Sequence, residues 1–355
     1  MSQISSQWLV PHNRKIMLII FLLLTITIFF PFETFASNDN SEEQKNDIEE
    51  NIRGVLIPEG YFWFGTQIVM GDGNLVSPNS KDGAEPRKYK KVPSFRMDST
   101  VVTNEMFKKF VDETEYKTEA ENYGWSFVLE QLASTKTIKI VDSKEGMGRV
   151  PNSKHWMGVV GADWRHPEGP DSNIDDKMQY PVVQVSHTDA ESYCEWADMS
   201  LPHEIEWEYA ARGGFVNKTY PWGDVYYNNH INIWEGKFPK HDNEAKDGYI
   251  GIAPAESYKP NDYGLYNMLG NVWEWCRGGT SEERILRGGS FIDSLYGEFN
   301  HAVMVSTRQI NTGDSAADNT GFRCVKVNKK KKNSKKKLEK KNNNKRNNKN
   351  ESPDL

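Results

Sequence analysis

Three cysteines have the most distinctive chemistry in this chain of 355 residues: Cys194, Cys276 and Cys324. A thiolate can bind a soft metal ion, attack a disulfide or pair with a second thiol. Three cysteines are too few for a small disulfide-dense scaffold. The eight histidines show no metalloprotease spacing, so they do not predict a catalytic zinc site.

The elements that must position these residues are a few helices and short strands. Helices are predicted over residues 103–114, with Thr103 as the cap, over residues 186–197, with Thr188 as the cap, and over residues 202–211. The strand candidates are residues 55–57, 61–65, 95–102 and 285–291. The remainder is rich in Gly, Asn and Trp. The sequence therefore predicts an α+β domain with much irregular structure.

The charge is distributed unevenly along the chain. Residues 328–355 carry 12 basic and 3 acidic residues, which leaves 32 basic and 47 acidic residues before them. An acidic body argues against a nucleic-acid partner, whose phosphates attract Lys and Arg. The basic tail has no apolar periodicity, so we expect it to be disordered. It is either simply solvated or weakly attracted to anionic lipid or polysaccharide.

The first 36 residues are typical of a secretory signal peptide. A basic flank precedes an apolar run of 15 residues from Ile16 to Phe30, and the small residue Ala36 follows. A membrane span needs roughly 20 apolar residues, so the run favours a cleaved signal over an uncleaved anchor. We expect no membrane span in the chain after signal cleavage. Residues 37–53 are acidic and predicted to be flexible. In the secretory pathway, the sequence Asn217-Lys-Thr219 would carry an N-linked glycan on Asn217.

Five segments occur in a recognisable order within residues 54–327. They are residues 161–170, 201–214, 220–224 and 261–275, and the pair 286–291 with 320–324. Gly-Asn-Val-Trp-Glu-Trp275 together with Gly-Phe-Arg-Cys324 is a highly specific combination. The set resembles the formylglycine-generating enzyme family, whose active members oxidise a cysteine in newly made sulfatases. The resemblance implies one α+β domain of that C-type-lectin-related kind over residues 54–327.

The resemblance implies that catalytic cysteines are missing here. Active members carry Gly-Gly-Ser-aromatic-x-Cys-x-x-x-x-Cys, and the two thiolates bind copper(I). In this chain the segment starts at Gly288 and places Asp293 and Glu298 at the two cysteine positions. A carboxylate binds copper(I) poorly and forms no mixed disulfide with a substrate thiol. The chain is therefore similar to the inactive paralogues of the family, and we expect neither copper nor catalysis.

The remaining cysteines have different expected roles. The resemblance pairs Cys194 with Cys324 in a disulfide, which an oxidising compartment permits. Cys276 follows Trp-Glu-Trp275, where the family has another residue type. We therefore expect Cys276 to be a packed free thiol. The alternative is that the protein is an oxidoreductase that acts on protein cysteine and uses Cys276 as its thiol.

The resemblance also implies two structural calcium sites, because Ca²⁺ prefers six to eight oxygen ligands. The first set comprises the side chains of Asn232 and Asp247 and the carbonyls of Ile233 and Tyr249. The second comprises the side chains of Asn267 and Glu274 and the carbonyls of Gly270 and Val272. The alternative for the second set is that its side chains cap turns by hydrogen bonding.

Three further residues match positions that line the family's peptide groove: Ser290, Arg308 and Asn319. An arginine there can pair with a peptide carboxylate or carbonyl, and plain structural hydrogen bonding is the alternative. We predict a non-catalytic protein of the endoplasmic reticulum lumen, retained or secreted. It would bind sulfatases or the active enzyme, as a homodimer, a heterodimer or alone, and dampen sulfatase activation. A secreted lectin-like module is a third option, without an identified carbohydrate surface.

Overall fold

The computed structural model describes residues 53–65, 87–143, 146–239, 243–295, 297 and 300–327. The chain divides into two units after Ile52, and every described residue belongs to the second unit. The predicted signal peptide, the acidic segment up to residue 52, the basic tail and Glu298 therefore lie outside the described residues.

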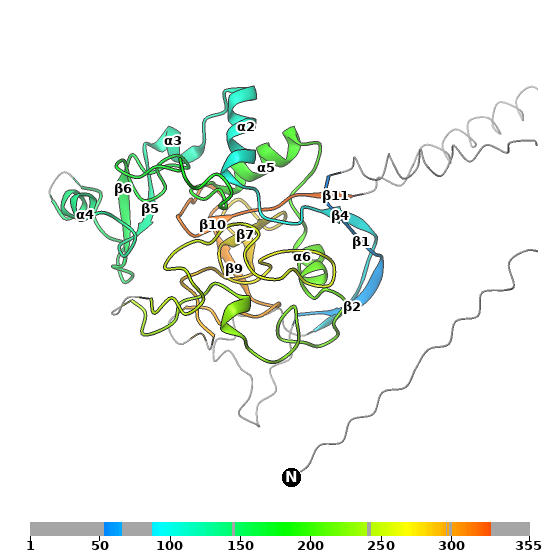
Figure 1. Cartoon of the computed structure of the whole chain (residues 1–355). Coiled ribbons are helices and arrows are strands. Elements are labelled where there is room, and N and C mark those ends of the chain that lie inside the picture. The colour runs from blue at the N-terminus through cyan, green and yellow to red at the C-terminus, as the bar shows by residue number, and fades with distance from the viewer. Residues whose placement is uncertain are drawn as a thin grey trace, which may run out of the picture. The chain divides into compact units, whose positions relative to one another are not determined.

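Short helices and strands alternate with long irregular stretches (Figure 1). The helices are α2 (Asn104–Thr114), α3 (Glu119–Tyr123), α4 (Thr135–Val141), α5 (His187–Trp196) and α6 (Glu204–Ala211), with a 3₁₀ turn at Asn228–His230. The strands are β1 (Val55–Ile57), β2 (Gly60–Phe64), β3 (Lys88–Val92), β4 (Phe95–Met97), β5 (Trp125–Leu129), β6 (Trp156–Val160), β7 (Trp273–Cys276), β8 (Arg284–Arg287), β9 (Arg308–Asn311), β10 (Thr320–Gly321) and β11 (Val325–Val327). The predicted α+β class with much irregular structure is confirmed.

The described strands form four small sheets, ordered β1-β4-β11, β10-β7-β8-β9, β2-β3 and β5-β6. In the four-stranded sheet β7 pairs antiparallel with β8 and parallel with β10. Glu274 of β7 is in register with Arg287 of β8 and with Gly321 of β10. The sheet thus brings the Trp-Glu-Trp segment beside the Gly-Phe-Arg-Cys segment.

The helix caps follow the sequence with one exception. Thr103 caps α2 as predicted, because its Oγ1 accepts the N–H of Met106 at 3.3 Å. The prediction that Thr188 caps α5 is wrong, since Thr188 lies inside the helix. Ser186 is the cap, and its Oγ accepts the N–H of Asp189 at 3.1 Å. The Asp189 carboxylate accepts the Ser186 N–H at 2.8 Å in return, which completes a capping box.

Two predicted strands are shorter than the apolar pattern indicated. β4 ends at Met97 rather than at residue 102, and β8 ends at Arg287 rather than at residue 291. Gly288 and Gly289, with φ of 96° and 78°, turn the chain out of β8. This left-handed backbone region favours glycine, so the Gly-Gly pair ends the strand and leads into the turn of residues 290–293.

Two large hydrophobic clusters pack these elements together. One joins β2 and β4 to α6 and contains Trp207 and Cys276. The other contains Phe107 of α2, Tyr193 of α5 and Trp275 of β7. The rings of Phe107 and Tyr193 stack at 5.9 Å, and α2 and α5 lie side by side in Figure 1.

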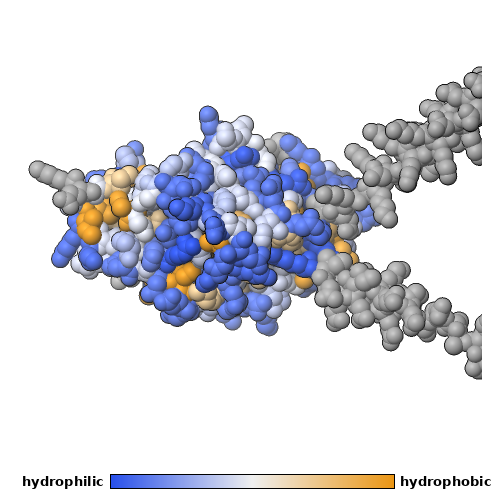
Figure 2. Space-filling view, turned by 90° about the horizontal axis from the view of Figure 1, so that it is seen from above, coloured by the Kyte–Doolittle hydropathy of each residue, from blue (hydrophilic) through white to orange (hydrophobic). Residues whose placement is uncertain are grey.

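The surface is mainly polar. Figure 2 shows a face that is largely hydrophilic, with hydrophobic residues gathered in separate spots. Among the described residues, no helix has the length and apolar character that crossing a membrane requires.

Candidate functional site

Asp293, which the resemblance predicts at the first catalytic cysteine position, fixes a buried turn. Its Oδ2 accepts the backbone N–H and the hydroxyl of Ser290, both at 2.8 Å, and its Oδ1 accepts the N–H of His301 at 3.1 Å. The Asp293 N–H donates back to the carbonyl of Ser290 at 3.1 Å. Burial raises the pKa of Asp293, and the nearby His301 opposes that rise. The carboxylate therefore acts as an internal acceptor for three donors.

The three predicted groove residues divide into two groups. The hydroxyl of Ser290 accepts from Nδ2 of Asn319 at 3.0 Å, so these two residues and Asp293 form one network. Ser290 and Asn319 are buried. Arg308 on β9 donates instead from Nε to Glu204 Oε2 at 2.9 Å, at the start of α6. Ser290 and Asn319 therefore hydrogen-bond within the buried turn, and the half-buried Arg308 is ion-paired with Glu204.

Cys276 is a fully buried thiol at the end of β7. Its sulfur lies 3.9 Å from the Glu274 carbonyl oxygen, and it packs within the cluster that contains Trp207. Burial raises the pKa of the Cys276 thiol well above its usual value, although Arg287 opposes the rise. A buried thiol with a raised pKa is a poor nucleophile. The packed-thiol alternative therefore fits the structure.

The predicted disulfide between Cys194 and Cys324 is confirmed. It joins α5 to the residue that precedes β11, and its Cα atoms lie 5.7 Å apart. The bond closes a loop across a sequence separation of 130 residues. A loop of that length contributes about 5 kcal/mol by restricting the unfolded chain.

The charged residues of the two most specific motifs bind each other. Arg323 donates from Nε and Nη2 to the two carboxylate oxygens of Glu274, both at 2.8 Å. Their side chains are 0% and 1% exposed. Trp207 adds a third donor, because its Nε1 lies 2.7 Å from Glu274 Oε2. The motif pair is thus a bidentate ion pair inside the core.

The first predicted calcium set comes together around a buried carboxylate. Asp247 accepts the N–H of Ile233 at 3.0 Å and the N–H of Tyr249 at 2.9 Å. Burial raises the pKa of Asp247 to about 6. Oδ1 of Asn232 is buried without a hydrogen-bond partner. An unmatched buried amide oxygen and a buried carboxylate are both oxygen donors of the kind that Ca²⁺ prefers.

The second predicted set fits a cation only in part. Oδ1 of Asn267 is also buried without a partner, while its Nδ2 donates to the carbonyls of Pro254 and Ala255 at 3.1 and 3.2 Å. The charge of Glu274, by contrast, is already neutralised by Arg323. The amide oxygen is therefore free to bind a cation, whereas the carboxylate has a protein partner.

A close backbone contact connects the two sets. Gly270 forms an isolated bridge with Asn232, and a Cβ on Gly270 would lie 2.2 Å from the Asn232 carbonyl oxygen. The N–H of Asn271 donates to that carbonyl at 2.8 Å. Because only glycine tolerates this approach, the two loops are locked in register. Val272, the last residue of the second set, is buried in a small apolar cluster.

No group of three or more His, Cys, Asp and Glu side chains that could hold a metal occurs in the described part of the chain. Each predicted calcium set contains one carboxylate among amide and carbonyl oxygens, so neither set would form such a cluster. Their signal here is the pair of unmatched buried oxygens on Asn232 and Asn267.

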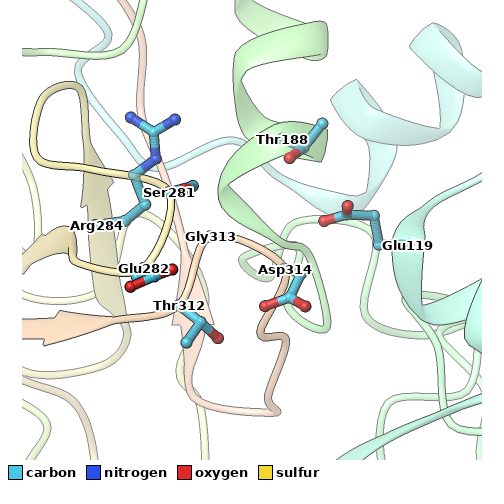
Figure 3. A pocket seen from close by; sticks show the side chains of 8 residues that line it. All are labelled: Glu119, Thr188, Ser281, Glu282, Arg284, Thr312, Gly313 and Asp314. Atoms are coloured by element: carbon cyan, nitrogen blue, oxygen red, sulfur yellow. The ribbon is translucent and has the colours of Figure 1, made fainter.

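A pocket of about 400 Å³ lies between the helices and the β8–β9 region (Figure 3). None of the predicted site residues lines it. Its lining comprises Glu119, Thr188, Ser281, Glu282, Arg284, Thr312, Gly313 and Asp314. Figure 3 shows Glu119 approaching from one side and Arg284 from the other. The mixture of three carboxylates, one guanidinium and hydroxyls identifies no particular ligand.

Asn217, the predicted glycan acceptor, is exposed in a turn with φ of 57°. Its Oδ1 accepts from Nη1 of Arg87 at 2.8 Å. The turn is fixed by Asp224, which accepts from Lys218 Nζ at 2.7 Å and from Thr219 N at 3.1 Å.

Sequence reasoning missed a second buried charge network on α6. Glu208 accepts from Arg212 and Arg287, and the side chains of Glu208 and Arg287 are both fully buried. Arg287 also lies over the rings of Phe64 and Trp207, at 5.7 and 5.5 Å. Arg287 is 79 residues from Glu208, so local sequence does not reveal this pair, whereas the i,i+4 spacing of Glu208 and Arg212 was an available signal.

The chain matches a family described as "Sulfatase-modifying factor enzyme 1-like domain" over residues 37–328. It belongs to this family. The inactive C-alpha-formylglycine-generating enzyme 2 of Bos taurus is 44% identical over 280 residues, 78% of this chain and 88% of that protein. The formylglycine-generating enzyme of Mus musculus is 40% identical over 290 residues, 76% of this chain and 74% of that protein.

A solved structure agrees with this fold. The structure of PvdO from Pseudomonas aeruginosa has a TM-score of 0.54 and 19% identity, and covers 77% of this chain and 93% of that chain. At this identity the similarity shows the fold alone. The predicted family and fold class are confirmed, and the match to relatives named inactive supports a non-catalytic paralogue.

Proposed function

We propose that this member of the sulfatase-modifying factor family is a non-catalytic regulator of sulfatase activation. The observation that carries the proposal is the state of its thiols. Cys194 and Cys324 are joined to each other, and Cys276, the third cysteine of the sequence, is fully buried. Cysteine oxidation by a thiolate–copper(I) centre needs accessible thiolates. At the position predicted for the first catalytic thiolate stands Asp293, whose carboxylate already accepts three hydrogen bonds from within the protein.

The proposed partners are sulfatases and the active formylglycine-generating enzyme. A chain that keeps the fold but lacks the redox thiols can occupy a binding surface without turning the substrate over. Competition of this kind would dampen sulfatase activation. The proposed location is the endoplasmic reticulum lumen, reached through the signal-like first 36 residues, with a glycan on Asn217 of the Asn-Lys-Thr sequence.

Calcium is the proposed structural cofactor, and copper is not expected. Asn232 and Asp247 with the carbonyls of Ile233 and Tyr249 would hold one ion. The unmatched Asn232 oxygen and the buried Asp247 carboxylate support this site most strongly. Calcium would supply charge compensation there and tie loops that lack helices and strands.

The catalytic part of the proposal is tested with a Cys-x-Pro-x-Arg peptide, copper(I) and a reductant. Mass spectrometry of the peptide reports formylglycine, and Cys276→Ser is the matched control. We expect no conversion by either form. Conversion by the wild-type chain that disappears in Cys276→Ser would overturn the proposal and establish the alternative, an oxidoreductase that acts on protein cysteine.

The regulatory part is tested by adding the full chain to an active formylglycine-generating enzyme and the same peptide. We expect the initial rate to fall as the chain is titrated, with Arg308→Ala weaker as an inhibitor if the groove is used. Arg277→Ala, which removes another α6-paired arginine outside the predicted groove, is the matched control. An unchanged rate together with no binding to a sulfatase in a pull-down would contradict the proposal.

A further inference from the structure

Three aromatic rings form an exposed row on the outer face of the β2–β3 sheet. Tyr61, Trp63 and Tyr89, called here the aromatic strip, are 57%, 41% and 59% exposed. The alternate residues Phe62 and Phe64 point into the core. Tyr61 stacks on Tyr89 at 5.6 Å and 14°, and Trp63 meets Tyr89 at 5.1 Å. The strip is therefore a continuous apolar platform that faces solvent, a feature that usually has a partner.

A single side chain connects the strip to the sequon. Arg87 lies over the ring of Trp63, with 5.2 Å between its guanidinium carbon and the ring centroid. The same guanidinium donates from Nη1 to Oδ1 of Asn217 at 2.8 Å. Arg87 therefore bridges Asn217 and Trp63 at the end of the strip, and its cation–π contact holds the two side chains close together.

The amide nitrogen of Asn217 is available for modification. Oδ1 is occupied by Arg87, whereas Nδ2 donates no hydrogen bond to any described residue. In N-glycosylation Nδ2 loses a proton and bonds to C1 of the first sugar, and the lipid pyrophosphate that carried the oligosaccharide leaves. The exposed turn at Asn217 and the bond to Arg87 direct the side chain toward the β2–β3 sheet.

We propose that the glycan on Asn217 packs its first sugars against the aromatic strip. This inference rests on the proposed secretory route and glycosylation of Asn217. The C–H face of a pyranose ring is apolar and flat, so it stacks on Trp and Tyr faces. Arg87 lies over Trp63 and Lys91 lies over Tyr61 at 5.4 Å, so both offer hydrogen-bond donors to the hydroxyls of a sugar that packs beside them on the strip. The glycan would be part of the folded surface and cover an otherwise exposed apolar row.

The test uses the full chain secreted by a eukaryotic host whose glycans are held at the high-mannose stage. Peptide mass spectrometry first measures occupancy of Asn217. The native protein is then treated with an endoglycosidase, and the rate of glycan release is compared among variants. We expect Trp63→Ala to release the glycan at least about fivefold faster than wild type. Tyr123→Ala removes an equally exposed ring on α3 and should leave the rate unchanged.

A second measurement keeps the test independent of folding defects. Trp63→Phe retains an aromatic face and should restore most of the protection, and removal of the glycan should lower the melting temperature of wild type but not of Trp63→Ala. Equal release rates in all variants with Asn217 occupied would overturn the packing alone. An unoccupied Asn217 would overturn the glycosylation and, with it, this inference.

Discussion

Replacing Arg323 with methionine tests whether Glu274 acts through a buried ion pair or through calcium. The guanidinium donates to both Glu274 oxygens and to the carbonyls of Asp98, Ser99 and Tyr266 at 3.3, 3.1 and 2.9 Å. With both side chains buried, methionine would leave the Glu274 charge without its cation. It would also leave three carbonyls without their donor.

The expected cost follows from the burial of the pair. Removing one partner of a buried ion pair destabilises a protein by about 3–5 kcal/mol. The double variant Glu274→Gln/Arg323→Met has no uncompensated charge. Its free energy of unfolding should therefore exceed the value expected from adding the two single losses by about 2 kcal/mol. A control pair that is only partly buried, Arg277 and Glu206 at 2.9 Å, should contribute no more than about 1 kcal/mol.

The assay is urea unfolding followed by tryptophan fluorescence, with calcium and with a chelator. If Glu274 acts through Arg323, Glu274→Gln loses the same stability in both buffers, and the two single losses are not additive. The reasoning is refuted if the loss in Glu274→Gln disappears in the chelator, or if the losses add in the double variant. Either result would return Glu274 to the calcium set.

Three other predictions follow from the buried groups. Chelation should lower the melting temperature of wild type by several degrees in calorimetry, and Asp247→Asn should remove most of that difference, whereas an unchanged wild type would exclude the site. Cys194→Ser/Cys324→Ala should lower the free energy of unfolding by about 5 kcal/mol in urea, and a loss below about 1 kcal/mol would contradict the loop argument. Burial raises the pKa of Asp318 from 3.8 to about 8, so its stabilising contribution is complete below 3.8 and is lost as the pH rises through about 8. Asp318→Asn should therefore gain stability relative to wild type as the pH rises between those values, by at most roughly 1.4 kcal/mol per pH unit, and a difference independent of pH would refute this.

Local patterns predicted α2, α5 and α6 but neither α3 nor α4, and they predicted most strands poorly. Thr103 could be predicted as a helix cap because its hydroxyl accepts a hydrogen bond from an N–H only three residues away. β7 is buried at every position, including Glu274, so it lacks the exposed polar face that marks a half-buried strand. β3 consists largely of lysine, and its pairing with β2 rather than its own composition makes it a strand. Strand pairing is a property of distant segments and leaves little trace within either one.

The candidate site shows the same division. Family resemblance predicted the Cys194–Cys324 pairing across 130 residues because both cysteines match the family pattern, and the calcium set around Asp247 stays a prediction. The resemblance did not reveal that Glu274 is held by Arg323, or that Glu208 is held by Arg287, 79 residues away. Such pairs need the folded sheet and α6 to bring opposite charges together in the core.

The turn at residues 290–293 depends on the Asp293 carboxylate. A cysteine there offers one weak acceptor where the carboxylate now satisfies the N–H and hydroxyl of Ser290 and the N–H of His301. Each buried donor left unmatched costs about 1–3 kcal/mol, so Asp293→Cys should lower the free energy of unfolding by about 2–4 kcal/mol in urea. Asp293→Asn keeps one acceptor oxygen, so its free energy of unfolding should lie between those of wild type and Asp293→Cys. If Asp293→Cys is as stable as wild type, the carboxylate does not hold the turn.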